Sequence, residues 1–164
     1  MAQTASAALW FLPFALPICI WAAWSDLKFM KIPNKSVLAL GIVFLVIGLI
    51  ALPWAEYPWR LLHLVVVLVI GFLLNMGGMI GAGDAKFAAV MAPFVALADL
   101  RLMIVLFAAV LLAAFLTHRV FRAVPAMRGA TRDWKSWTAK DFPMGLALGG
   151  TLVFYLALGI SSGT

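Results

Sequence analysis

Six acidic side chains are the candidates for chemistry in this sequence, and two of them stand out by their position. Asp26 lies directly after a long apolar run, in WSDLKFMKIPNK, and Asp84 lies between two apolar runs, in GMIGAGDAKF. Ionisable groups at a membrane are costly and are therefore functional candidates by default. The remaining acids fall at the opposite ends of such runs, or in a basic loop where Arg and Lys can pair with them: Glu56, Asp99, Asp133 and Asp141.

Two carboxylates held at one depth on different helices suit an aspartic protease. One ionised Asp can take a proton from water while its protonated partner polarises the scissile carbonyl group. Two like charges a few ångströms apart do not both ionise easily, so such a pair holds one proton over a wide pH range. Because the two groups titrate as a coupled unit, the residues leave open whether Asp26 or Asp84 is the base.

Each carboxylate also has a purely structural interpretation. Asp26 could be a solvated carboxylate near Lys28, and Asp84 could cap the N-terminus of the helix that follows it. Two features favour a site at Asp84. The apolar run after it is too short to cross a membrane unless residues 81–86 dip below the interface, and the neighbouring glycines allow a substrate strand to approach closely.

The composition sets the environment of these residues. Of the 164 residues, 66% are apolar and 11% are charged, and the mean hydropathy is +1.11. Soluble domains are about 45–50% apolar and about 25% charged, and disordered chains combine low hydrophobicity with high charge. Both classes are therefore excluded. The single cysteine, Cys19, allows no disulfide framework and no thiolate zinc site.

Long uncharged runs predict the elements that position the two acids. Only helices and closed barrels satisfy their backbone in lipid, and these runs lack the alternation of barrel strands. We expect an all-α membrane bundle of about six transmembrane helices, forming a single membrane-embedded domain over residues 1–164. The expected spans are approximately 7–24, 36–55, 61–80, 84–98, 102–118 and 142–160, with a basic loop over 119–141.

The basic residues predict the orientation of this bundle, because positively charged loops stay in the cytoplasm. Of the 12 Lys and Arg residues, all but Arg60 and Arg101 follow the first, third or fifth span. Both termini are therefore expected on the non-cytoplasmic side. Asp26 and Asp84 are then expected at the cytoplasmic face.

Three segments resemble signatures of the prepilin peptidases, which are polytopic aspartic proteases of the GxGD type. GAGDAKF at 81–87 looks like the signature that carries a catalytic Asp in that family. DLKFMKIPN at 26–34 is similar to the other signature, which has an Asp, a basic residue two positions later and then Ile-Pro-Asn. DFPMGLALG at 141–149 is similar to the Pro-x-Gly segment that opens the last span, with Leu146 where a Pro is common. Presenilin-like proteases share GxGD but lack the Ile-Pro-Asn segment.

The resemblance implies a membrane peptidase that removes the basic leader from type IV prepilin-like or pseudopilin precursors at the cytoplasmic face. It implies Asp26 and Asp84 as the catalytic pair, without a metal or other cofactor. The surrounding signature residues are expected to bind substrate or to support the pair: Gly81, Gly83, Lys86, Lys28, Ile32, Pro33 and Asn34. Lys28 and Lys86 could tune the acidity of the pair or merely anchor helix ends.

The same resemblance points to the short form of the family, which is associated with tight-adherence and type IV pilus systems. Larger members carry a four-cysteine metal site and methylate the new N-terminus, and neither feature is expected here. The implied location is the cytoplasmic (inner) membrane of a bacterial or archaeal cell, and the implied partners are the precursor and the lipid bilayer. Nucleic acid is not an expected partner, because a basic loop of this kind is commonly a topology signal.

Two alternatives to an active protease remain. A transporter, channel or pilus-assembly subunit could use a membrane carboxylate to bind a proton or a cation. That function predicts an acid near the middle of a span or broken helices in matching halves, whereas both candidates lie at one face. A catalytically silent homologue could act as an assembly factor.

Overall fold

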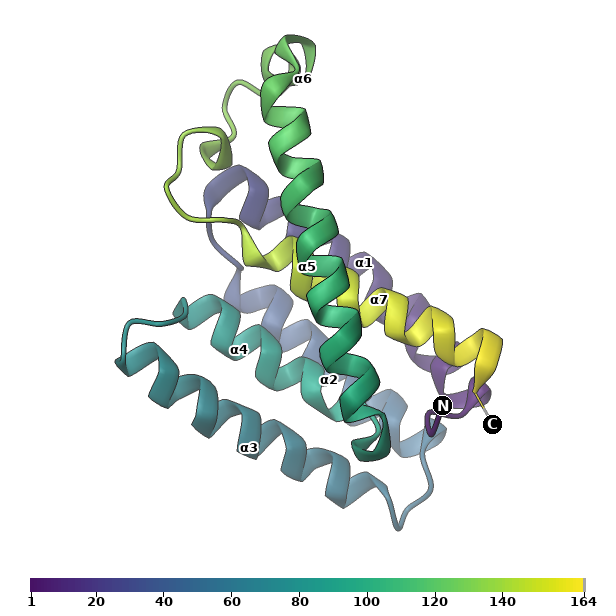
Figure 1. Cartoon of the computed structure of the whole chain (residues 1–164). Coiled ribbons are helices and arrows are strands. Elements are labelled where there is room, and N and C mark those ends of the chain that lie inside the picture. Colours follow the sequence, from purple (N-terminus) through teal and green to yellow (C-terminus); the bar gives the residue numbers. More distant parts are fainter. Residues whose placement is uncertain (164) are drawn as a thin grey trace.

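The computed structural model describes residues 1–163, and within that range it contains helices and no strand (Figure 1). The α-helices are α1 (Ala5–Phe29), α2 (Asn34–Ala51), α3 (Tyr57–Met76), α4 (Ala82–Met91), α5 (Leu100–Ala123), α6 (Pro125–Ala130) and α7 (Met144–Ser162). Three short 3-10 helices join them: η1 (Ala92–Phe94), η2 (Leu97–Asp99) and η3 (Lys135–Trp137). The expected all-α fold is confirmed.

Five segments are long and apolar enough to cross a membrane: α1, α2, α3, α7 and Leu97–Ala123, which contains α5. The chain is therefore a multi-pass membrane protein. The fourth expected span is instead a helix of 10 residues, α4, which covers only about 15 Å. It gives way to η1 at Pro93, whose missing N–H interrupts the helical hydrogen bonds.

The helices pack in a chain of neighbours around a small aromatic core. α1 lies against α7 over most of its length, α2 packs on α1, and α4 joins α2 to α3 (Figure 1). Phe11 of α1, Phe44 of α2 and Phe94 of η1 meet with ring centroids 4.9 to 5.8 Å apart. Large apolar side chains such as Leu38, Ile70 and Ile104 point outward, as expected of surfaces that face lipid.

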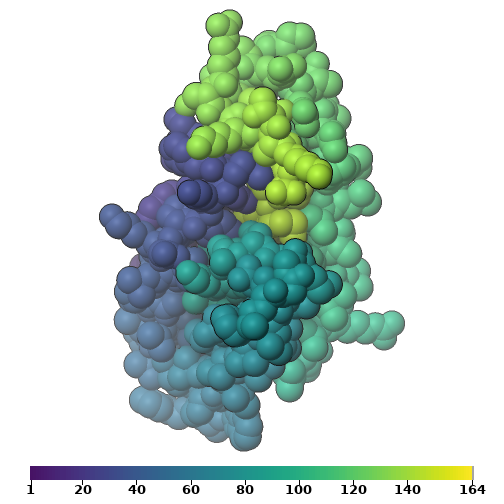
Figure 2. All heavy atoms as spheres, turned by 90° about the vertical axis from the view of Figure 1, so that its left-hand side faces the viewer, coloured from purple at the N-terminus to yellow at the C-terminus, as the bar shows by residue number. Residues whose placement is uncertain are grey.

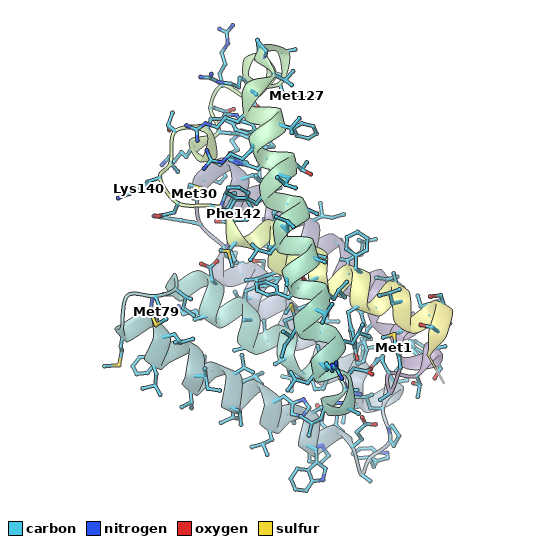
Figure 3. The ribbon with its side chains drawn as sticks, viewed as in Figure 1. Met1, Met30, Met79, Met127, Lys140 and Phe142 are labelled. Atoms are coloured by element: carbon cyan, nitrogen blue, oxygen red, sulfur yellow. The ribbon has the colours of Figure 1, made fainter. Side chains whose placement is uncertain are left out.

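The bundle has two ends, which we name by their acidic residues. The Asp26 end contains the turns after α1 and α3 and the polar segment before α7, and the Asp99 end contains the two termini. Figure 3 shows Met30, Met79 and Phe142 at the Asp26 end and Met1 at the opposite end. At the Asp99 end, the Ser162 hydroxyl lies 3.4 Å from the sulfur of Met1.

Three expected boundaries at the Asp26 end are wrong. α1 continues to Phe29, so Asp26 lies inside the helix and not after it. α5 continues to Ala123 and α6 follows, so the first part of the expected loop over 119–141 is helical. Residues 82–86 form the first turns of α4 instead of a dipping loop. Charged residues such as Asp26 end a hydrophobic run, but they do not end a helix. Helices usually end at or before the residue that precedes a proline, as α5 does ahead of Pro125.

Candidate active site

Asp26 lies in the last turns of α1 and is held by the beginning of α7. Its side chain is buried, with 5% of the residue exposed. The backbone N–H of Gly145 donates a hydrogen bond of 2.7 Å to Asp26 Oδ2. Gly145 is in the first turn of α7, where backbone N–H groups have no partner within the helix and are free to bind a carboxylate. The two helices therefore fix this oxygen jointly.

Gly145 can approach Asp26 only because it has no side chain. A Cβ atom at this position would lie 2.9 Å from Asp26 Cβ, 3.1 Å from Asp26 Oδ2 and 3.3 Å from the carbonyl oxygen of Ala22. Sequence reasoning did not assign Gly145 to the site. The signal was present, because Gly145 and Gly149 form a GxxxG pair, which is typical of close helix packing. Gly149 does pack in this way, against the backbone of Cys19.

The chain leaves α1 through a tightly bonded turn. Met30 adopts a left-handed conformation with φ 55°, and its N–H donates to the carbonyl oxygen of Asp26 at 2.8 Å. The Ser25 hydroxyl donates to the carbonyl oxygen of Lys31 at 3.0 Å. Pro33 then precedes the first residue of α2 and disfavours a helical conformation at Ile32. The Ile-Pro-Asn segment is thus fixed relative to Asp26.

Asp84 is the third residue of α4, and its carboxylate turns back toward the start of that helix. The backbone N–H of Gly81 donates a hydrogen bond to it. A Cβ atom at Gly81 would lie 2.7 Å from Asp84 Oδ2, so the carboxylate occupies the space of a side chain there. The N-cap position itself is Gly81, and Asp84 caps the start of α4 from the third helical position by accepting the Gly81 N–H.

The beginning of α4 faces the end of α1. Burial, and secondly the negative charge of Asp26, raise the pKa of Asp84 to about 6, while the hydrogen bond from Gly81 acts in the opposite direction. α4 is not among the candidate spans, and Asp84 is partly exposed. The start of α4 lies against the turn that follows Asp26, so the structure brings the two carboxylates to one end of the bundle, although 58 positions separate them in the sequence.

Two contacts explain this approach. A Cβ atom at Gly83 would lie 3.5 Å from Ile32 Cβ, so α4 begins directly beside the Ile-Pro-Asn segment. The Lys86 ammonium donates to Asn34 Oδ1 at 3.4 Å. Figure 2 shows this face, where segments near residues 30, 80 and 140 adjoin.

The lysines of the two signatures contact groups other than the two acids. Lys28 Nζ lies 2.7 Å from Asp133 Oδ2 and 5.4 Å from the centroid of the Trp24 ring. Lys28 thus connects the polar segment after α5 to α1. Together with the contact of Lys86 to Asn34, this favours an anchoring role over direct tuning of the pair.

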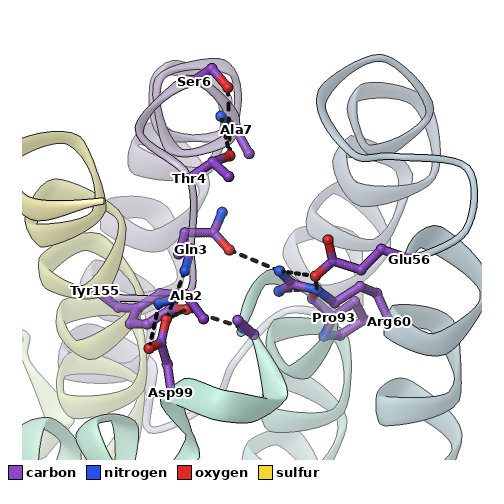
Figure 4. A network of polar contacts seen from close by, with 11 residues as sticks. Ala2, Gln3, Thr4, Ser6, Ala7, Glu56, Arg60, Pro93, Asp99 and Tyr155 are labelled. Carbon is purple, nitrogen blue, oxygen red and sulfur yellow. Dashed lines mark hydrogen bonds and ion pairs between the residues drawn. The ribbon is translucent and has the colours of Figure 1, made fainter. Parts of the chain in front are cut away.

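Asp99 is a second buried carboxylate, at the other end of the bundle. From the sequence, it was expected only to lie on the side of the membrane opposite to Asp26. Asp99 accepts hydrogen bonds from the backbone N–H groups of Ala2 and Gln3, at 2.8 and 2.9 Å. The Tyr155 hydroxyl donates a third, at 2.9 Å (Figure 4). Asp99 therefore fixes the first residues of the chain to α7.

Arg60 extends this cluster to α3. Its buried guanidinium pairs with Glu56 at 2.7 Å and donates to Gln3 Oε1 at 3.1 Å and to the carbonyl oxygen of Pro93 at 3.4 Å (Figure 4). Asp99, Glu56 and Arg60 thus all bind protein partners.

Comparison with known proteins addresses the family directly. No curated protein and no solved structure gives a match. A model of the type IV leader peptidase family matches residues 13–118, which is more than half of the chain. The match contains Asp26, Asp84 and the Ile-Pro-Asn segment, whereas Gly145 lies outside it. The chain belongs to the type IV leader peptidase family and is a leader-peptidase-like protease of a membrane.

Proposed function

We propose that this protein is an aspartic endopeptidase that removes the basic leader from type IV prepilin-like precursors, with Asp26 and Asp84 as its catalytic pair. The family supports a protease that processes such precursors. The observation that carries the assignment of the pair is the contact of the start of α4 with the turn after Asp26, which puts two carboxylates at one end of the bundle. Asp26 is buried with one donor on Oδ2, and Asp84 is partly exposed beside it.

The proposed reaction needs one proton shared by the pair. The ionised carboxylate takes a proton from water, and the resulting hydroxide bonds to the carbonyl carbon of the scissile peptide. The protonated carboxylate gives its proton to the carbonyl oxygen, so a tetrahedral gem-diol forms. When the C–N bond breaks, the carboxyl group that took the water proton gives it to the leaving amine, and the other carboxylate takes a proton from one gem-diol hydroxyl as the carbonyl group reforms.

Asp84 is the better holder of the shared proton. Its pKa of about 6 is raised by burial and by the charge of Asp26, so it retains a proton closer to neutral pH than an ordinary Asp. Asp26 Oδ2 accepts the N–H of Gly145, and the negative charge of Asp26 helps to hold the proton on Asp84. We therefore assign Asp26 as the base and Asp84 as the acid in the first step.

The supporting residues act through backbone position and space. Gly81 leaves room for the Asp84 carboxylate, while Gly83, Ile32 and Asn34 bring the start of α4 to the turn after α1. Pro33 fixes that turn. The concentration of basic residues at the Asp26 end supports a cytoplasmic position for the pair.

Cleavage by membrane vesicles tests both activity and orientation. Vesicles of the cytoplasmic membrane containing the protein are incubated with a prepilin-like precursor peptide, and mass spectrometry identifies the products. Inverted vesicles should cut between the basic leader and the hydrophobic helix, also in the presence of a chelator. Right-side-out vesicles should not cut. Cleavage by right-side-out vesicles alone would contradict the orientation, and inhibition by the chelator would contradict a metal-free pair.

A further inference from the structure

A small cavity lies between the end of α5 and the polar segment that leads to α7. Its volume is about 50 Å³. His118, Arg119 and Arg122 of α5 line it on one side, and Ser136 of η3 and Lys140 line it on the other. These five residues lie outside the proposed catalytic pair and the signatures around it, and Asp141 and Phe142, which begin the 141–149 signature, also line the cavity.

Two buried polar atoms of the lining have no hydrogen-bond partner. They are Nε2 of His118, a residue with 7% exposure, and Oγ of Ser136, a residue with 1% exposure. In residues 1–163 only one other buried side-chain atom shares this property, Nε2 of Gln3 at the Asp99 end. A serine hydroxyl can donate one hydrogen bond, and Nε2 of His118 donates a second in the tautomer that carries its proton on this atom, so the cavity can offer two donors to a ligand.

The imidazole cannot easily turn away to satisfy its nitrogen elsewhere. The His118 ring stacks on Trp137 with a centroid distance of 5.0 Å and an interplanar angle of 17°. The plane of the Phe142 ring is nearly perpendicular to the His118 ring, and the two centroids lie 5.8 Å apart. Two aromatic neighbours thus hold the ring in place at the cavity wall.

The charge of the lining indicates the class of ligand. Arg119, Arg122 and Lys140 contribute three positive charges, and Asp141 is the one carboxylate in the lining. The Arg119 guanidinium is positioned over the Phe115 ring, 5.0 Å from its centroid. A compact anion with several acceptor oxygens matches three cationic groups and two neutral donors, and phosphate is such an anion.

The position of the cavity indicates where the phosphate comes from. It lies near the end of the apolar segment Leu97–Ala123, which is long enough to cross a membrane. On the same helix, Leu116, Val120 and Phe121 are exposed next to the lining residues. We propose that the cavity binds the phosphate group of an anionic phospholipid, with the acyl chains beside α5. This proposal is independent of the catalytic one.

Native mass spectrometry of the full chain in detergent tests this site. Phosphatidylglycerol and phosphatidylcholine are added at equal concentrations, and inorganic phosphate is added as a competitor. We expect one tightly bound phosphatidylglycerol, because the choline cation of the other lipid is repelled by three basic side chains. Equal retention of the two lipids would overturn the proposal. Displacement by inorganic phosphate at concentrations similar to those of the lipid would overturn the lipid as its source.

Variants locate the binding to this cavity. Arg122→Gln removes a charge and Ser136→Ala removes a buried donor, and the Arg122 change should weaken phosphatidylglycerol binding about tenfold, as for a charge-assisted hydrogen bond. Arg132→Gln is the matched control, since it removes a charge from the same polar segment outside the cavity. Thermal melting verifies that each variant is folded. Unchanged binding in both folded variants, or an equal loss in the control, would refute the site.

Discussion

Asp26 and Asp99 are equally buried, with 5% and 6% exposure, yet they lie in opposite chemical situations. Asp99 accepts three hydrogen bonds, from two backbone N–H groups and a tyrosine hydroxyl. Within the described residues, the Asp26 carboxylate accepts one hydrogen bond, from the backbone N–H of Gly145. A second carboxylate, Asp84, is close enough for the charge of Asp26 to act on it. Burial alone therefore does not distinguish Asp26, which we propose as a catalytic acid, from Asp99. The spare acceptor capacity of Asp26 and the neighbouring Asp84 do.

The two ends of the bundle also differ in how the backbone surrounds each acid. At the Asp99 end, the first residues of the chain pack into the bundle and Arg60 binds them from the other side. At the Asp26 end, Gly145 and Gly81 lie where a side chain would meet a carboxylate. At the Asp99 end the carboxylate binds the first residues of the chain, whereas at the Asp26 end two glycines leave room for a carboxylate.

A large effect should follow from a methyl group at Gly145, where α7 approaches Asp26. Gly145→Ala places a Cβ atom 2.9 Å from Asp26 Cβ, so α1 and α7 must separate and the carboxylate must move. We expect precursor cleavage to fall roughly 100-fold, as for a misplacement of about 1 Å in an active site. Gly159→Ala is the matched control, because it crowds the same helix pair against Ala8 at the Asp99 end. Equal losses of activity in the two folded variants would remove the special role of Gly145.

An intermediate effect, on stability and not on chemistry, is expected at Asp99. Asp99→Asn replaces one acceptor oxygen by a donor, so at least one of the three hydrogen bonds is lost. An unpaired buried donor costs about 1–3 kcal/mol of unfolding free energy. Thermal melting in detergent should show the loss, and Tyr155→Phe should also lower stability, because it leaves the Ala96 N–H without its acceptor and removes one donor from Asp99. Cleavage per folded molecule should stay near normal in both, and its loss in either would break the distinction between the two ends.

The smallest effect is a shift in titration. In Asp26→Asn the negative charge beside Asp84 is removed, so Asp84 ionises more readily and its pKa should fall below about 6. Burial still acts on Asp84, so the pKa should remain above the ordinary value of 3.8. Infrared titration of the carboxyl band, with the Asp26→Asn/Asp84→Asn double variant as the blank, measures this. The same pKa with and without Asp26 would show that the two groups do not interact.

The sequence was informative about what hydrophobicity and local signatures determine. Long apolar runs predict helices in lipid, and the two acidic signatures were expected at one end of the bundle. The structure has them there, because helices that cross a membrane in alternating directions return their turns to the same side. The short run after Asp84 also predicted an element unable to span alone, and α4 is such an element.

What the sequence left out depends on contacts between distant residues. The hydrogen bond from Gly145 to Asp26 joins positions 119 apart, and a glycine in a helix motif does not reveal which side chain it will meet. The cluster of Asp99, Tyr155 and Gln3 is hidden for the same reason. The extent of α1 was underestimated because Asp26 ends the apolar run but does not end the helix.

Cleavage by three isosteric variants, compared in one assay and normalised to folded protein, tests the central claim most directly. Asp26→Asn and Asp84→Asn keep the side-chain volume but cannot exchange the proton, so each should lower the cleavage rate by about 10²–10⁴-fold. Asp99→Asn makes the same chemical change in an equally buried acid and should retain most of its activity. Robust cleavage by either of the first two, or an equal loss in all three, would contradict the assignment of Asp26 and Asp84 as the catalytic pair.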